Sequence, residues 1–553
     1  MATFYSSKTD NNALAYVDGR VFTMNDHHPW AEAFIVSPSG VFEAVGTTEY
    51  IKTIASRRGL IICSLGDRFV MPGIHDGHTH LLFAGYTSLY HTEIGRTANA
   101  NTIANLLEKS HCLCKYTNVM GEWIIGNYYV SNLFPDGLAD RRYLDVAYPD
   151  KPVLVREISG HKVLVNSAGL RYLGLDPNTA VEPEGGVYSR RPDGSMTGEL
   201  KEVATGVAWL NMPVPPLSAV KKAMVHSIKT CHMYGITSVQ EASANTLYLH
   251  ALRELEDDNE LNLDICTHIV CKNEFFPSES NASLEALLDV SEAFKSKHVD
   301  TRYVKFWLDG SPLEPGSTHS CLGLDGEPDR RMLLLDDETL LAAVKKYDGR
   351  GMTVKMHAAG EGSIRQALNV YEAVRKENPN GPRHEVAHSN AIHPDDFARL
   401  ASLRVTAEMS PSVFDQVDEL AADVLRFEFN QVHKAGGLCT FGTDWPVTEN
   451  PNLLQPLAAL LDKVTVDPVP LAKQLKTQKE FAARVICRAI TLGAAENLDK
   501  GTETGSIETG KKANFIMVNQ DLSKGEFSGA IVQKTWFEGR LVWDIDGEFK
   551  VSI

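Results

Sequence analysis

Two histidines separated by a single residue, His78 and His80, are the first side chains in the chain with recognisable chemistry. They follow the apolar run Arg68–Met71 and a Pro-Gly break, in the segment Val70-Met-Pro-Gly-Ile-His-Asp-Gly-His-Thr-His80. Side chains at positions i and i+2 of a strand point to the same face, so both imidazoles can converge on one divalent ion such as zinc. Because such pairs also occur in ordinary cores, the meaning of this pair depends on what later strands carry.

Apolar runs from about residue 220 onward alternate with segments of helix length, which is typical of βα units around a parallel sheet. The expected strands are Ile236–Val239, Ile265–Val270, Tyr303–Phe306, Thr353–His357, His384–His388, Val405–Met409 and Leu438–Asp444. With the strand at Val70 they make eight. Eight βα units predict an α/β fold of the (β/α)8 TIM-barrel type, whose chemistry lies at the carboxyl-terminal ends of the strands.

Side chains that can bind metals lie at or just beyond the ends of several expected strands. They are His78 and His80 after the first strand, Lys305 on the fourth, His357 and His388 ending the fifth and sixth, and Asp444 ending the eighth. Each has an ordinary alternative: a lysine can extend towards water, a buried histidine can bond to the backbone, and an aspartate after Gly-Thr is a common turn residue. Their shared position at one barrel mouth predicts a metal site.

Short apolar runs with turns between them occur at both ends of the chain and suggest strands at 13–17, 20–23, 33–36, 41–45, 513–518 and 532–542. The N-terminal runs are expected to form a small antiparallel sheet. Because neither end is long enough to bury a core alone, we expect residues 1–70 and 496–553 to form one β-sandwich beside a barrel domain of residues 71–495. The mixed stretch at about 86–220 is too long for one barrel connection and is interpreted as an inserted subdomain.

The overall composition excludes some classes of partner. A net charge of −17 argues against nucleic acid and anionic membranes, which both require basic patches. No apolar stretch reaches the length of a membrane span, and the first residues show no cationic segment followed by an apolar run. The nine cysteines are scattered without a CxxC motif, which favours reduced thiols. We therefore expect a cytoplasmic protein.

With these motifs in place, the chain resembles the amidohydrolase superfamily of metal-dependent hydrolases, and more narrowly its YtcJ-like branch, which includes N-substituted formamide deformylases. The resemblance covers nearly the whole chain. Besides the His78 segment it is carried by Ser159-Gly-His-Lys-Val-Leu-Val-Asn-Ser167, Gly235-Ile-Thr-Ser-Val239, Val304-Lys-Phe-Trp-Leu-Asp-Gly-Ser311, His357-Ala-Ala-Gly-Glu-Gly362, Arg383-His-Glu-Val-Ala-His388, Gly442-Thr-Asp-Trp-Pro-Val447 and Gly505-Ser-Ile-Glu-Thr-Gly-Lys-Lys-Ala513.

The resemblance implies a role for each candidate ligand. His78 and His80 would bind one metal, His357 and His388 a second, and Lys305, carbamylated by CO2, would bridge the two. Asp444 would ligate the first metal and act as general base on the water. The implied cofactor is one or two divalent ions, with zinc expected. The chemistry is consistent, because metal cations make hydroxide accessible near neutral pH and a neighbouring carboxylate can carry the proton.

Further candidates lie outside the ligand set. The resemblance implies that His161, in a Ser-Gly-His turn of the inserted segment, contacts the substrate carbonyl, although a purely structural histidine is an equal alternative. Trp307, Phe414 and Trp445 are candidate pocket aromatics, and His319 is a candidate substrate contact on a loop. Single aromatics are more often packing residues, and an exposed loop histidine is more often only solvated.

The predicted function is hydrolysis of a C–N bond in a small molecule, an amide or an N-formyl or N-acyl amine, by activated water. The same ligands would also serve ester or lactone hydrolysis, deamination or decarboxylation, and fold analogy does not choose among them. A scaffold without catalysis is a further alternative. No arginine stands out in the sequence as a carboxylate clamp, which favours a neutral or apolar substrate. Relatives are commonly dimers, but no sequence feature marks an interface.

Overall fold

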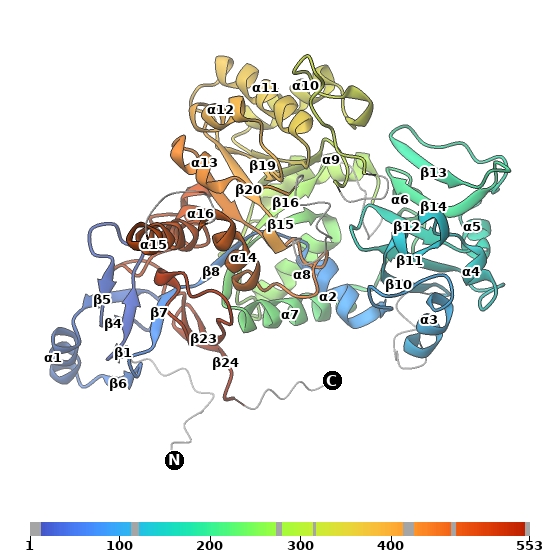
Figure 1. Ribbon diagram of the computed structural model, residues 1–553. Coiled ribbons are helices and arrows are strands. Elements are labelled where there is room, and N and C mark those ends of the chain that lie inside the picture. The colour runs from blue at the N-terminus through green and yellow to red at the C-terminus, as the bar shows by residue number, and fades with distance from the viewer. Residues whose placement is uncertain are drawn as a thin grey trace. The chain divides into compact units, whose positions relative to one another are not determined.

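The computed structural model describes residues 13–111, 121–271, 279–312, 317–412, 425–465 and 472–547. The chain divides into two compact units (Figure 1). One consists of residues 1–77, 229–239 and 452–553, and the other of residues 78–228 and 240–451. Within the described ranges, no helix is both long and apolar enough to cross a membrane, and no cysteine forms a disulfide.

The longest sheet is a nearly closed parallel barrel. Its strands, in order, are β21 (Leu438–Phe441), β20 (Val405–Met409), β19 (His384–His388), β18 (Thr353–Ala358), β17 (Val299–Trp307), β16 (Asp264–Val270), β15 (Ile236–Ala244) and β8 (Ile74–Thr79). The two ends of the sheet meet where Thr79 bridges to Trp445 and the His80 amide donates to the Trp445 carbonyl at 2.9 Å. The predicted (β/α)8 fold is confirmed.

The first barrel strand is not the one predicted. The run Arg68–Met71 lies mostly in β7 (Phe69–Pro72), which pairs with β2 (Arg20–Phe22) and β22 (Phe515–Val518) in another sheet. The barrel strand is β8, which begins after Gly73. A Cβ at Gly73 would lie 2.2 Å from Thr237 Oγ1, so the chain changes sheets at a residue that needs no side chain. His78 therefore lies within β8 and His80 directly follows it.

Helices lie between the barrel strands. They are α8 (Thr246–Asp257), α9 (Asn281–Val290), α10 (Asp337–Asp348), α11 (Glu361–Glu377), α12 (Phe397–Ser402) and α13 (Phe429–Lys434). Side chains fix several helix starts: Asn245, Ser280 and Asp336 each accept a hydrogen bond from the backbone amide three residues on. Such N-caps satisfy donors that the helix itself leaves unpaired, and they define where each βα connection ends.

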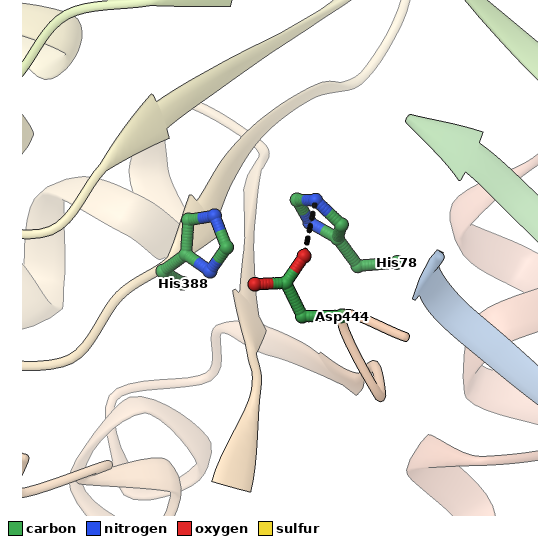
Figure 2. A group of neighbouring side chains, drawn as sticks. All are labelled: His78, His388 and Asp444. Carbon is green, nitrogen blue, oxygen red and sulfur yellow. Dashed lines mark ion pairs between the residues drawn. The ribbon is translucent and has the colours of Figure 1, made fainter. Parts of the chain in front are cut away.

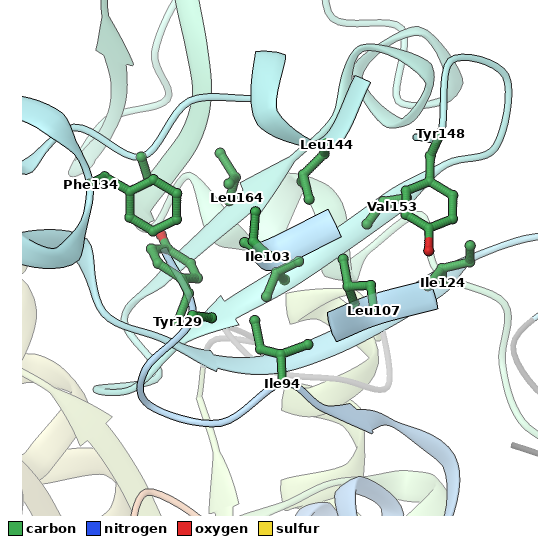
Figure 3. Packing of buried hydrophobic residues seen from close by; sticks show 13 residues of the cluster. Ile94, Ile103, Leu107, Ile124, Tyr129, Phe134, Leu144, Tyr148, Val153 and Leu164 are labelled. Atoms are coloured by element: carbon green, nitrogen blue, oxygen red, sulfur yellow. The ribbon is translucent and has the colours of Figure 1, made fainter. Parts of the chain in front are cut away.

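An inserted six-stranded sheet separates α2 (Leu81–Tyr90) from α7 (Leu217–Met233). Its strand order is β13 (Gly186–Arg190), β14 (Met196–Glu202), β12 (Lys162–Val165), β11 (Val153–Glu157), β10 (Ile124–Tyr129) and β9 (Thr92–Glu93), with α3 (Ile103–His111), α4 (Arg142–Asp145), α5 (Ser167–Tyr172) and α6 (Thr205–Trp209) beside it. Ile103 and Leu107, one helical turn apart on α3, pack on Ile124, Val153 and Leu164 of the sheet (Figure 3). The insertion thus has its own apolar core.

Both ends of the chain contribute to one β-sandwich, as predicted. One sheet is β5 (Phe42–Gly46), β4 (Ala33–Val36), β1 (Leu14–Val17) and β6 (Ile61–Ser64), and the other is β24 (Arg540–Asp544), β23 (Val532–Phe537), β22, β7, β2 and β3 (Trp30–Ala31). The rings of Phe34 and Phe515 lie 4.9 Å apart between the sheets. The expected purely antiparallel N-terminal sheet is wrong, because β1 pairs with β6, and β2 with β7, in parallel. The same unit contains α1 (Thr48–Arg58), α14 (Leu454–Thr465), α15 (Ala472–Ala489) and α16 (Leu492–Asn497).

Candidate metal site

Three buried side chains from three strands meet at the carboxyl-terminal end of the barrel (Figure 2). His78 comes from β8, His388 ends β19, and Asp444 follows β21. One potential ligand atom of each lies within 4.8 Å of the others. His78 Nε2 is 3.6 Å from Asp444 Oδ1, and the rings of His78 and His388 are 4.6 Å apart. Imidazole nitrogens and carboxylate oxygens bind zinc and similar ions, so this group can hold a divalent cation.

His80 and Lys305 adjoin this group. His80 Nε2 lies 3.2 Å from Asp444 Oδ1, and Lys305 Nζ lies 3.3 Å from His78 Nε2. The Lys305 side chain is only 1% exposed, although it carries an amine. The structure therefore brings the histidine pair, the lysine and the aspartate predicted from the sequence into one contiguous cluster.

His388 also neighbours His357, which in turn neighbours His161. The His357 ring is 4.4 Å from the His388 ring and 5.2 Å from the His161 ring. However, His357 Nε2 faces Asp309 Oδ1 at 3.6 Å and the Gly310 carbonyl at 3.4 Å. His357 consequently lines the same cavity but stands outside the tight group of three.

Each histidine of the cluster has a partner on its Nδ1 atom. Glu408 Oε2 lies 2.8 Å from His78 Nδ1, Ser243 Oγ lies 2.8 Å from His80 Nδ1, and Ser410 Oγ lies 3.3 Å from His388 Nδ1. For His161, Glu202 Oε2 lies 2.9 Å from Nδ1. A hydrogen bond to one ring nitrogen fixes the orientation of the ring and leaves Nε2 as the donor atom for a metal. The donor set therefore fits a divalent ion.

The backbone at two of these residues is strained. The backbone angle φ is 70° at His388, 39° at the following Ser389 and 54° at Asp444. Residues other than glycine occupy this left-handed region at an energetic cost, and such positions cluster at functional sites. Here the unusual backbone directs the ends of β19 and β21 so that an imidazole and a carboxylate reach the same point as His78.

Burial shifts the ionisation of the cluster towards neutral forms. Desolvation, assisted by the nearby charge of Lys355, lowers the pKa of Lys305 to about 7. Desolvation raises the pKa of Glu408 to about 7, and it holds the pKa values of His78 and His388 well below the ordinary value of 6.5. Both imidazoles are therefore neutral at pH 7, which is the form that ligates a metal.

A buried charged layer lies beneath the cluster. The strand register sets Lys305 beside Lys355 and Lys355 beside Glu385 on β17, β18 and β19. Lys355 Nζ pairs with Glu385 Oε2 at 2.9 Å and also bonds to Gln240, with the lysine and the glutamate fully buried. TIM barrels usually fill this position with branched apolar side chains. Here a compensated ion pair occupies it, so the barrel core below the site is polar.

A small cavity of about 20 Å³ lies inside this shell of side chains. A volume of roughly 10–15 Å³ accommodates one water, so the cavity suits a water molecule or an ion. All the ligands predicted from the sequence line it, together with Phe83 and Trp307. The inserted sheet contributes Arg156 and the turn Ser159–His161.

The weaker candidates have different positions. Trp307 lines the cavity, and its ring lies 5.2 Å from Lys305 Nζ. Trp445 is buried and closes the barrel through its carbonyl, but it is not among the lining residues. His319 lies 3.2 Å from Cys321 Sγ, also away from the lining. Phe414 lies outside the described residues.

Sequence reasoning missed several residues of the site. Glu408, Ser243 and Arg156 were not singled out, although the structure places each on a cavity histidine or on the cavity itself. A charged residue inside an otherwise apolar strand, as in Val153-Leu-Val-Arg-Glu157 and Val405-Thr-Ala-Glu-Met409, was the available signal. A buried charge requires a partner, and both residues are nearly or fully buried.

Comparisons with known proteins agree with this geometry. The sequence model of the Amidohydrolase family matches residues 62–543. YtcJ of Bacillus subtilis (strain 168) is 25% identical over 95% of this chain and 98% of its own length. The N-substituted formamide deformylase of Arthrobacter pascens is 22% identical over 98% of this chain and 100% of its own length. An uncharacterized metal-dependent hydrolase from Pyrococcus horikoshii OT3 shares the fold, with a TM-score of 0.69 and 21% identity over 93% of this chain and 99% of that one.

Proposed function

Because this chain belongs to the amidohydrolase family, we propose that it is a metal-dependent hydrolase that cleaves the C–N bond of an amide or of an N-formyl or N-acyl amine. The observation that supports this proposal most directly is the convergence of His78, His388 and Asp444 on one buried point, with His80 and Lys305 beside them. The full-length similarity to an N-substituted formamide deformylase supports the choice of bond.

The metal ligands in this proposal are the predicted ones. His78, His80 and Asp444 would hold one ion, and His357 and His388 would hold a second. Lys305 would join them as a carbamate, because its buried amine has a pKa of about 7 and a substantial fraction of it is in the neutral form that reacts with CO2. When bound, divalent cations supply Lewis acidity, which polarises a carbonyl and makes water a stronger acid.

The chain's own residues would handle the proton and the substrate. Asp444 is near both His78 and His80, so its carboxylate can accept a proton from the attacking water and deliver it to the leaving amine. The hydroxyl part of the water forms the new bond to the acyl carbon as the C–N bond breaks, giving an acid and an amine. His161, whose Nδ1 faces Glu202, lines the same cavity and would bind the substrate carbonyl.

The test combines metal content with intact mass under native conditions, for the wild type and Lys305→Ala. We expect about two metals per chain and a mass larger by one CO2 in the wild type, and loss of both in the variant. Hydrolysis is then assayed on N-formyl and N-acyl amines, with esters, lactones and aminopurines as comparison substrates. Cleavage of the comparison substrates alone would contradict the proposed bond. A folded protein without metal or activity would favour the scaffold.

A further inference from the structure

Among the described residues, Arg156 is the one arginine or lysine that the inserted sheet adds to the lining of the cavity. It lies on β11, directly before the turn that carries Ser159, Gly160 and His161. The residue is 3% exposed. Its guanidinium therefore lines the same buried cavity as Asp444 and the candidate metal ligands.

The surroundings of Arg156 hold its plane but give its N–H groups few hydrogen-bond partners among the described residues. The guanidinium carbon lies 3.9 Å above the Phe83 ring. Nη1 lies 3.5 Å from Asn127 Oδ1, which is a long hydrogen bond. Nη2 lies close to the Gly160 backbone, since a Cβ at Gly160 would be 3.3 Å from it. Nε has no hydrogen-bond partner among the described residues. Stacking on an aromatic face orients a guanidinium, and its in-plane N–H groups stay available for a ligand.

Among the described residues, no carboxylate forms an ion pair with Arg156. The charges of Glu157 and Asp444 still act on its guanidinium from beyond ion-pair distance. The adjacent Glu157 accepts hydrogen bonds from the Ser159 amide at 2.8 Å and from its hydroxyl, and its main favourable charge interaction is with Lys162. Desolvation lowers the pKa of Arg156 to about 10, so the guanidinium is still charged at pH 7. A buried charge without a partner is costly, and functional sites are where proteins keep such charges.

We propose that Arg156 binds a carboxylate of the substrate, so that the substrates are N-formyl or N-acyl amino acids rather than neutral amides. This inference rests on the proposed function, since it names the substrate class of that same site. Arg156 lines the same cavity as the candidate metal ligands, so a carboxylate bound to it would lie within a few bonds of the scissile C–N bond, as in an α-amino acid. The guanidinium matches a planar carboxylate with two parallel hydrogen bonds. The sequence favoured a neutral substrate because Arg156 lies in no recognisable motif. The position of Arg156 in the cavity lining leads us to propose an acidic substrate instead.

The test compares substrates that differ only in the carboxylate. N-Formylglycine and N-formylalanine are each paired with the corresponding N-formyl alkylamine, and hydrolysis is measured for the metal-loaded wild type, Arg156→Gln and Arg156→Lys. Arg171→Gln, at an exposed arginine of the same insertion, is the matched control. We expect the wild type to prefer the acid by on the order of 100-fold in kcat/KM, mainly through KM. Arg156→Gln should lower kcat/KM on the acid far more than on the neutral partner and so remove this preference. Arg156→Lys should retain part of the preference, and Arg171→Gln should match the wild type.

Binding provides a second readout that does not require turnover. Calorimetric titration with N-formylglycine and with N-methylformamide should show selective binding of the acid to the wild type and none to Arg156→Gln. A wild type that prefers the neutral partner would overturn the proposal, as would an equal loss on both substrates in a folded Arg156→Gln protein. If the metal-loaded wild type cleaves no amide yet binds the acid through Arg156, the proposed function fails and the anion site stands. If the wild type cleaves neutral amides alone, the proposed function stands and the anion site fails.

Discussion

The barrel side and the inserted side of the cavity differ in how completely their side chains are satisfied. On the barrel side, His78, His80 and His388 each have an Nδ1 partner. Beneath them, Lys355 is paired with Glu385. On the inserted side, Arg156 is stacked and buried but has no ion-pair partner among the described residues. A fully supported set of donors suits a resident cation, and an unsupported charge suits a ligand that comes and goes.

The largest effect is expected from replacing Asp444 on the barrel side of the cavity. Asp444→Asn keeps the shape but removes the carboxylate that would carry the proton. We expect kcat for N-formyl substrates to fall by about 10²–10⁴-fold. Asp396→Asn, at a buried aspartate that pairs with Arg365, is the control and should retain kcat per folded molecule. Activity of Asp444→Asn within a few-fold of wild type would remove Asp444 from the catalytic role.

A second change tests whether the partners on the barrel side support metal binding. In Glu408→Gln the acceptor near His78 Nδ1 keeps its shape but loses its charge, so His78 becomes a weaker ligand. Zinc affinity, measured by competition with a chelator, should fall about 10–100-fold. Glu385→Gln removes a buried carboxylate that pairs with Lys355 instead, and zinc affinity should change less. Equal affinity losses in the two variants would mean that the effect is general to the barrel core.

The pH dependence of folding tests the buried amine of Lys305. Its folded pKa of about 7 lies below the ordinary value of 10.5. Between these values the unfolded chain binds a proton that the folded chain lacks, so stability from this residue rises with pH, by at most tenfold per unit in the folding constant. Below about pH 7 the full cost of burying the amine is present. We expect the urea midpoint of metal-free wild type, relative to Lys305→Met, to increase from pH 7 to pH 10. A constant difference would show that the amine is not neutral in the folded protein.

The smallest effect is expected at Phe83, where a substitution tests how Arg156 is positioned on the inserted side of the cavity. Phe83→Leu removes the ring beneath Arg156 but keeps an apolar side chain. Loss of one cation–π contact should reduce the preference for the acid substrate by about fivefold, through KM. The rate on the neutral partner should stay the same, which separates positioning of Arg156 from a general disturbance of the cavity. If both substrates respond alike, Phe83 acts by packing alone.

The same contrast explains what the sequence could predict. The barrel and the clustering of His78, His80, His388 and Asp444 were predictable because these residues sit in recognisable motifs at strand ends. Arg156 and Glu408 were not, because each lies in an ordinary-looking strand and acquires its role only through neighbours distant in the chain. The strand assignment failed at Arg68–Met71 for a related reason: one apolar run and the histidine segment looked continuous, whereas Gly73 divides them between two sheets.

The pairing of β7 with β22 has a consequence for how the protein is made. Residues 69–72 pair with residues 515–518, so the entire barrel is synthesised between the two partners. At about 5–20 residues per second, a nascent chain carries β7 without this neighbour for on the order of tens of seconds. During that time its edge can recruit other strands, which makes the early chain a natural client for chaperones. A chain interrupted before β22 would contain every cavity residue and still leave one edge of β7 without its partner strand.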